Sequence, residues 1–70
     1  MKNKFAERLK ELRLERKIST KELSDFIGCS NVAISRWENG LRLPSIYYIE
    51  KLALFFNVST DYLIGLKDYE

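Results

Sequence analysis

The 70-residue sequence has no histidine, one cysteine, one proline and three glycines. Because Cys29 is alone and histidine is absent, the chain cannot form an internal disulfide or a usual zinc site, so we expect no metal and no cofactor. The longest apolar run, residues 52–56, is too short to cross a bilayer, and the charged N-terminus lacks a signal-peptide core. These absences predict a cytoplasmic protein with no membrane partner. No nucleophile with a credible base and no glycine-rich phosphate loop is present, so we do not expect an enzyme.

Positive charge is concentrated at the start of the chain, although the net charge is only +2. Residues 1–19 carry seven basic and three acidic side chains, whereas residues 20–70 carry five and seven. An uneven distribution of this kind is compatible with nucleic-acid binding. On composition alone, the basic segment is better interpreted as the solvated face of a helix.

Apolar spacing, capping residues and glycines predict five short helices and no strand. They cover residues 5–16, about 20–27, about 31–39, a stretch after Pro44 and a short segment ending at Gly65. The predicted N-terminal caps are Ser19 with Glu22 as a capping box, Ser30, Ser45, and Ser59 or Thr60. The predicted inward positions are Phe5, Leu9, Leu12, Leu23, Ile27, Ile34, Trp37, Ile49, Leu52, Ala53, Phe56, Leu63 and Ile64. We therefore expect one compact all-α domain over residues 1–70, with its core between about 5 and 66.

The second and third predicted helices are joined by a tight turn, Gly28-Cys29-Ser30. Gly28 allows the backbone to reverse in the left-handed conformation, and Ser24 is small enough for the two helices to cross closely. Two apolar residues on each helix can pack together in a shared buried interface. This arrangement predicts a helix-turn-helix, although any helical hairpin shares the glycine and the apolar stripes.

The outward face of the third helix carries Asn31, Val32, Ser35 and Arg36, opposite its apolar positions. Asparagine can pair with adenine, arginine with guanine and serine with either, and valine can pack on a thymine methyl group. The alternative interpretation is a polar surface that faces solvent. Val32 argues mildly against that alternative, because an exposed valine gains nothing from water.

Motifs spread over nearly the whole chain share one spacing. They are Ser19-Thr20-Lys21-Glu22-Leu23, Ile27-Gly28, Ile34-Ser35-Arg36-Trp37-Glu38-Asn39-Gly40, Pro44-Ser45 and Val58-Ser59-Thr60-Asp61-Tyr62-Leu63. This pattern closely resembles the phage-repressor, or Xre-type, helix-turn-helix family. The resemblance implies a lambda-repressor-like five-helix fold that reads double-stranded DNA with its third helix. It also implies a transcriptional regulator, most simply a repressor, that binds a pseudo-palindromic operator as a homodimer.

The resemblance assigns roles to individual positions. It implies base contacts from Asn31, Val32, Ser35 and Arg36, and phosphate contacts from Thr20, Ser30, Asn39, Gly40 and Arg42. Thr20 replaces a longer glutamine of the family, so we expect the phosphate contact to be kept and the brace on the first recognition residue to be lost. Leu41 stands where a basic residue is common, which weakens the phosphate binding expected from this loop. The resemblance further implies an ion pair between Arg13 and Glu38, for which a structural role is the better interpretation.

Six apolar or aromatic residues in the C-terminal third do not fit the inward stripes. They are Tyr47, Tyr48, Leu54, Tyr62, Leu66 and Tyr69. A concentration of this kind indicates a surface for association. We expect a homodimer interface that includes Tyr62 and Leu66. The alternative function is a protein-interaction module, such as an antitoxin or antirepressor component, which would use the same surface.

Overall fold

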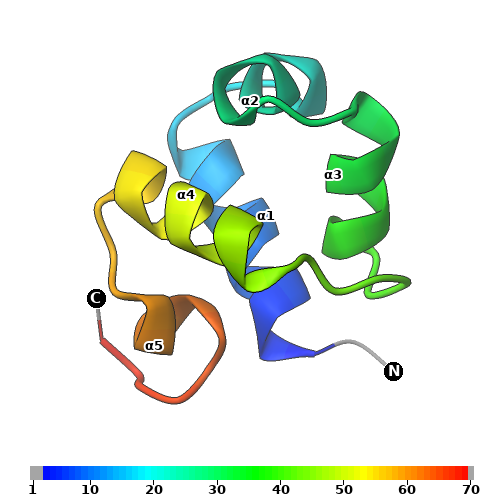
Figure 1. The fold of residues 1–70 in the computed structure, drawn as a ribbon. Helices are drawn as coiled ribbons and strands as arrows, with labels where there is room; N and C mark the ends of the chain where they lie inside the picture. The colour runs from blue at the N-terminus through cyan, green and yellow to red at the C-terminus, as the bar shows by residue number, and fades with distance from the viewer. Residues whose placement is uncertain (1–2, 70) are drawn as a thin grey trace.

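The computed structural model describes residues 3–69, and this part of the chain folds into five helices and no strand. The helices are α1 (Lys4–Glu15), α2 (Thr20–Ile27), α3 (Asn31–Glu38), α4 (Ile46–Phe56) and α5 (Thr60–Leu63). Helices α2, α3 and α4 surround α1, and α5 lies near the beginning of α1 (Figure 1). The expected all-α architecture is confirmed. The bounds of α2 agree with the prediction, whereas α3 ends one residue earlier because Asn39 is its C-cap.

Local capping chemistry explains where most helices begin. Ser19 accepts a hydrogen bond from the Glu22 backbone while the Glu22 carboxylate accepts one from the Ser19 backbone, which completes the predicted capping box. Ser30 and Ser59 cap α3 and α5 through their hydroxyl oxygens. Ser45 occupies the N-cap position of α4, but its side chain makes no capping bond. The prediction of a Ser45 cap is therefore right in position and wrong in chemistry.

A single core lies between α1, α2, α3 and the inner side of α4. Its buried hydrophobic residues are Phe5, Ala6, Leu9, Leu12, Leu23, Ile27, Ile34, Trp37, Leu52, Ala53, Phe56 and Leu63. Two predicted inward positions differ. Ile49 is only partly buried, and Ile64 is 40% exposed because it lies just beyond the last residue of the four-residue α5. No helix within residues 3–69 has the length and apolar content needed to cross a membrane.

Candidate nucleic-acid interface

The turn between α2 and α3 is fixed by backbone hydrogen bonds to one carbonyl group. Gly28 has φ +85°, and the amide groups of Gly28 and Cys29 both donate to the Ser24 carbonyl oxygen, at 2.8 and 3.1 Å. Ser24 is buried, and its hydroxyl donates to the Lys21 carbonyl at 2.7 Å, so the small side chain leaves no unpaired polar atom at the helix crossing. The tight turn predicted between the two helices is therefore present.

A contact from α4 adds to this turn. The Lys51 ammonium group donates to the Ile27 carbonyl at the C-terminal end of α2, at 2.9 Å. A positive charge at this end of a helix also interacts favourably with the helix dipole. Lys51 thus ties α4 to the helix that precedes the turn.

Helix α3 separates its buried and exposed side chains by face. Ile34 and Trp37 are buried on one side. The opposite side carries four exposed residues that the sequence analysis selected, Asn31, Val32, Ser35 and Arg36. Val32 is 56% exposed although it is apolar, so the core does not account for it. The four side chains form one continuous surface that can face an external partner.

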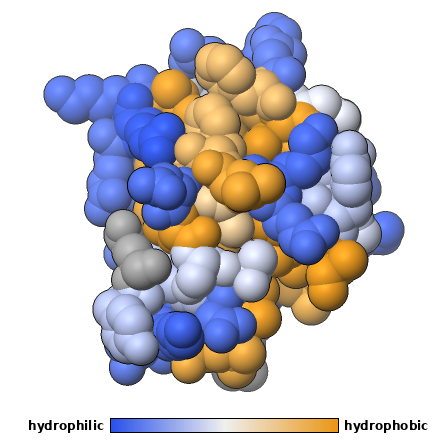
Figure 2. Space-filling model, turned by 60° about the vertical axis from the view of Figure 1, so that its left-hand side comes forward, coloured by the Kyte–Doolittle hydropathy of each residue, from blue (hydrophilic) through white to orange (hydrophobic). Residues whose placement is uncertain are grey.

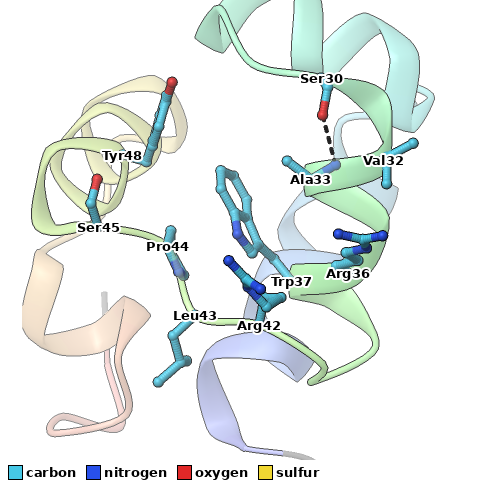
Figure 3. A pocket seen from close by; sticks show the side chains of 10 residues that line it. All are labelled: Ser30, Val32, Ala33, Arg36, Trp37, Arg42, Leu43, Pro44, Ser45 and Tyr48. Carbon is cyan, nitrogen blue, oxygen red and sulfur yellow. Dashed lines mark hydrogen bonds between the residues drawn. The ribbon is translucent and has the colours of Figure 1, made fainter.

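A shallow cavity of about 300 Å³ lies between α3 and the beginning of α4. Figure 3 shows Trp37 extending from α3 toward Pro44 and Tyr48, with Arg36 and Arg42 nearby. The rings of Trp37 and Tyr48 are 5.5 Å apart between centroids. The cavity therefore combines an aromatic floor with two exposed guanidinium groups. Its lining residues are Ser30, Val32, Ala33, Arg36, Trp37, Arg42, Leu43, Pro44, Ser45 and Tyr48.

An ion pair connects α1 to the C-terminal end of α3. The Arg13 Nε lies 2.6 Å from the Glu38 Oε2, and the Arg13 Nη2 lies 3.0 Å from Oε1, so the contact is bidentate. Arg13 also donates to the Ile18 carbonyl at 2.9 Å. The side chains are 12% and 6% exposed, respectively. The hydrogen bond to Glu38 raises the pKa of Arg13, so its charge is retained at any accessible pH.

The residues expected to contact phosphates lie around α3, at helix starts and in loops. Thr20 is the first residue of α2, and the Ser30 hydroxyl oxygen accepts the Ala33 amide at 3.0 Å. Gly40 has φ +73°, and Arg42 is exposed in the loop that follows. The side-chain nitrogen of Asn39 donates to the Ser35 carbonyl at 2.8 Å. The structure places Ser30, Asn39, Gly40 and Arg42 at or just beyond the two ends of α3, and Thr20 at the beginning of α2.

One residue beside this surface was not selected from the sequence. Ser45 is exposed, lines the cavity and makes no side-chain capping bond, so its hydroxyl is available at the N-terminal end of α4. In an eleven-residue helix this end carries a partial positive charge and free amide groups. The signal in the sequence was the Pro44-Ser45 pair, which was interpreted as a helix start and as part of the family resemblance but not as a DNA contact.

The C-terminal apolar residues divide into two groups. Tyr47, Leu54, Leu66 and Tyr69 are exposed, as expected. Tyr48 and Tyr62 instead pack against the core, so the prediction that they lie outside the inward stripes is wrong for these two. The guanidinium carbon of Arg8 lies 4.2 Å from the centroid of the Tyr62 ring, and Arg8 also donates to the Tyr62 and Lys67 carbonyls. Arg8 therefore covers part of the surface that was expected at a dimer interface.

A second apolar surface was missed from the sequence. Phe26 on α2 is 66% exposed, and its ring centroid lies 5.2 Å from that of Phe55 on α4. Arg16 stacks over Phe55 and donates to its carbonyl at 3.2 Å. Figure 2 shows apolar side chains gathered along the middle of one face, with hydrophilic side chains on either side.

No group of three or more potential metal ligands occurs in the described part of the chain.

Comparisons with known proteins agree with this geometry. A family model described as Helix-turn-helix matches residues 9–63. The chain is 37% identical to the transcriptional regulator ImmR of Bacillus subtilis (strain 168) over 61 residues, 87% of this chain and 48% of that protein. It is 31% identical to the transcriptional activator BcrR of Enterococcus faecalis over 61 residues, 87% of this chain and 30% of that protein. The chain thus spans less than half the length of these two relatives.

A solved structure shows the same arrangement of helices. The P22 c2 repressor in complex with a synthetic operator superposes with a TM-score of 0.85 and 33% sequence identity, over 90% of this chain and 96% of that one. From the family match and this likeness, the chain belongs to the helix-turn-helix family of phage-repressor type.

Proposed function

We propose that this chain binds double-stranded DNA sequence-specifically by inserting α3 into the major groove, and that it acts as a transcriptional repressor. The observation that carries the proposal is the exposed face of α3, on which Asn31, Val32, Ser35 and Arg36 lie opposite the buried residues. The likeness to a repressor bound to operator DNA supports it. A regulator of this kind works in the cytoplasm and needs no catalytic group.

Each exposed side chain has a chemistry that suits a base edge. Arg36 can donate two hydrogen bonds to the O6 and N7 of guanine, and Asn31 can pair with the N6 and N7 of adenine. Val32 can pack on a thymine methyl group, which would remove its exposed apolar surface from water. Ser35 adds one hydrogen bond. Together they supply direct reading of a few neighbouring base pairs.

The residues at both ends of α3 fit contacts to the sugar-phosphate backbone. Arg42 supplies a charge, and the backbone around Gly40 allows close approach. Ser45 and the free amide groups at the start of α4 offer neutral donors beside Arg42. Phosphate contacts set the orientation of α3 without selecting sequence. The proposed phosphate contacts are Thr20, Ser30, Asn39, Gly40, Arg42 and Ser45.

We further propose that two copies bind a pseudo-palindromic site, with their recognition helices one turn of DNA apart. Leu66 is 74% exposed and belongs to the proposed dimer surface, whereas Tyr62 would contribute only the part that Arg8 leaves uncovered. Sedimentation of the protein alone and with a palindromic duplex tests this. A strict monomer under both conditions would remove the dimer from the proposal.

Selection from random duplex DNA at two salt concentrations tests the function. The wild-type protein should enrich a palindromic motif, and Arg36→Ala should weaken binding to that motif by about 1–3 kcal/mol while relaxing one base position. Ser45→Ala is a matched variant at a phosphate position, which should weaken all duplexes alike and leave the motif unchanged. Weak and unselective binding that Arg36→Ala does not affect would reject the proposal. The exposed apolar surface around Phe26 would then favour a protein-interaction module.

A further inference from the structure

Ser35 and Asn39 lie one helical turn apart on the exposed side of α3. The side-chain nitrogen of Asn39 donates to the Ser35 carbonyl oxygen at 2.8 Å and lies 3.4 Å from the Ser35 hydroxyl oxygen. The Asn39 backbone amide also donates to that carbonyl, at 3.0 Å. Asn39 is thus folded back along α3, with its amide group against the Ser35 hydroxyl.

In the contact between the two side chains, the donor of the hydrogen bond is Asn39. The Nδ2 of asparagine carries only hydrogens to donate, so the Ser35 oxygen is the acceptor and its own hydrogen remains free. A serine inside a helix often donates that hydrogen to a preceding carbonyl, as Ser24 does to Lys21 at 2.7 Å. Within residues 3–69 the Ser35 hydroxyl donates no hydrogen bond and takes part only as the acceptor of the Asn39 contact. The Ser35 hydroxyl hydrogen is therefore available to a partner outside the molecule.

We propose that Asn39 is a positioning residue that makes Ser35 a hydrogen-bond donor toward a base edge. A donor can pair with the major-groove acceptors of guanine, thymine or adenine and disfavours cytosine, which offers only an amino group there. This inference rests on the proposed function, since it concerns how α3 reads DNA. It replaces the phosphate contact proposed above for Asn39 with a part in sequence selection, because the backbone amide and the side-chain nitrogen of Asn39 already donate to Ser35.

The experiment compares base preferences of four proteins on the selected duplex and its single-base variants. Ser35→Ala identifies the base pair that Ser35 reads, because the preference there should fall by about 3- to 10-fold, as expected for one hydrogen bond. Asn39→Ala should reduce the preference at the same base pair, and only there. Asn39→Asp should lose the preference as Asn39→Ala does, because a carboxylate can donate neither to the Ser35 carbonyl oxygen nor to the Ser35 hydroxyl oxygen.

Preference is measured as the ratio of two dissociation constants obtained with the same protein sample. The folded fraction cancels in this ratio, so a variant that is merely less stable still gives a valid result. An equal loss of affinity for all duplexes in Asn39→Ala would overturn the inference and leave Asn39 as a phosphate or structural residue. A Ser35→Ala protein with unchanged preferences would overturn it as well. Failure of the wild-type protein to select any motif is a separate result, which rejects the proposed function itself.

Discussion

Replacing Arg13 with alanine should remove a substantial part of the stability of the domain. The change removes two hydrogen bonds to Glu38 and one to the Ile18 carbonyl, and it leaves a carboxylate that is 6% exposed without its partner. Breaking a buried ion pair from one side costs about 3–5 kcal/mol. We expect the lower end, about 3 kcal/mol, because the Arg13 side chain keeps some contact with water. A domain of 70 residues has a total stability of roughly 4–10 kcal/mol.

Urea unfolding followed by tryptophan fluorescence measures this loss directly. Trp37 is the one tryptophan in the sequence, is buried, and precedes Glu38, so its emission reports on this part of the core. The matched controls are Arg13→Met alone, Glu38→Leu alone and the double variant that combines these two substitutions. The double variant should be more stable than Arg13→Ala, because it leaves no unpaired charge behind. Two single variants that each lose less than about 1 kcal/mol, with additive effects, would refute this reasoning.

Two further predictions concern backbone conformation and thiol chemistry. Gly28→Ala should destabilise the protein by about 1–2 kcal/mol, and Gly65→Ala should destabilise it roughly twice as much. Both residues have positive φ, but a Cβ added at Gly65 would lie 2.8 Å from the Lys4 Cβ, whereas a Cβ added at Gly28 would lie no closer than 3.8 Å to its nearest neighbour, the Lys51 Nζ. Thermal unfolding compares the two variants, and equal losses of stability would contradict the predicted clash with Lys4. Burial raises the pKa of the Cys29 thiol, against a smaller lowering by Lys51, so less thiolate forms at a given pH. Alkylation by iodoacetamide at pH 8 should therefore be slower in the folded protein than in urea, and an equal or faster native rate would count against it.

The sequence predicted those features whose causes lie within a few residues of one another. The capping box of Ser19 and Glu22 and the left-handed Gly28 are local, and the bounds of α2 followed from them. The Arg13–Glu38 pair joins residues 25 apart with no local signal, and only the resemblance to a family indicated it.

The features that were missed depend on neighbours from other helices. Tyr48 is partly buried because it packs beside Trp37, and Tyr62 because Arg8 stacks on its ring. The apolar periodicity of one helix cannot reveal contacts with side chains of other helices, since it indicates only which face of that helix is apolar. The exposed Phe26 was missed for a related reason, because its aromatic partner Phe55 is on another helix. For the same reason the operator sequence could not be predicted, since donor and acceptor roles such as that of Ser35 depend on neighbouring side chains.

Because α3 is short, residues on other helices contribute to the way in which it recognises DNA. Eight residues form a helix of about 12 Å, and an isolated helix of this length is unstable in water. Ser30 fixes its first turn, Ile34 anchors its middle to the core, and Trp37 together with the bidentate contact of Arg13 with Glu38 holds its last turn. Because these contacts order α3 before DNA arrives, little conformational entropy remains to be lost on binding. Loosening the ion pair should therefore weaken DNA binding even at urea concentrations where the domain is still folded, which distinguishes an ordered recognition helix from one that folds on its target.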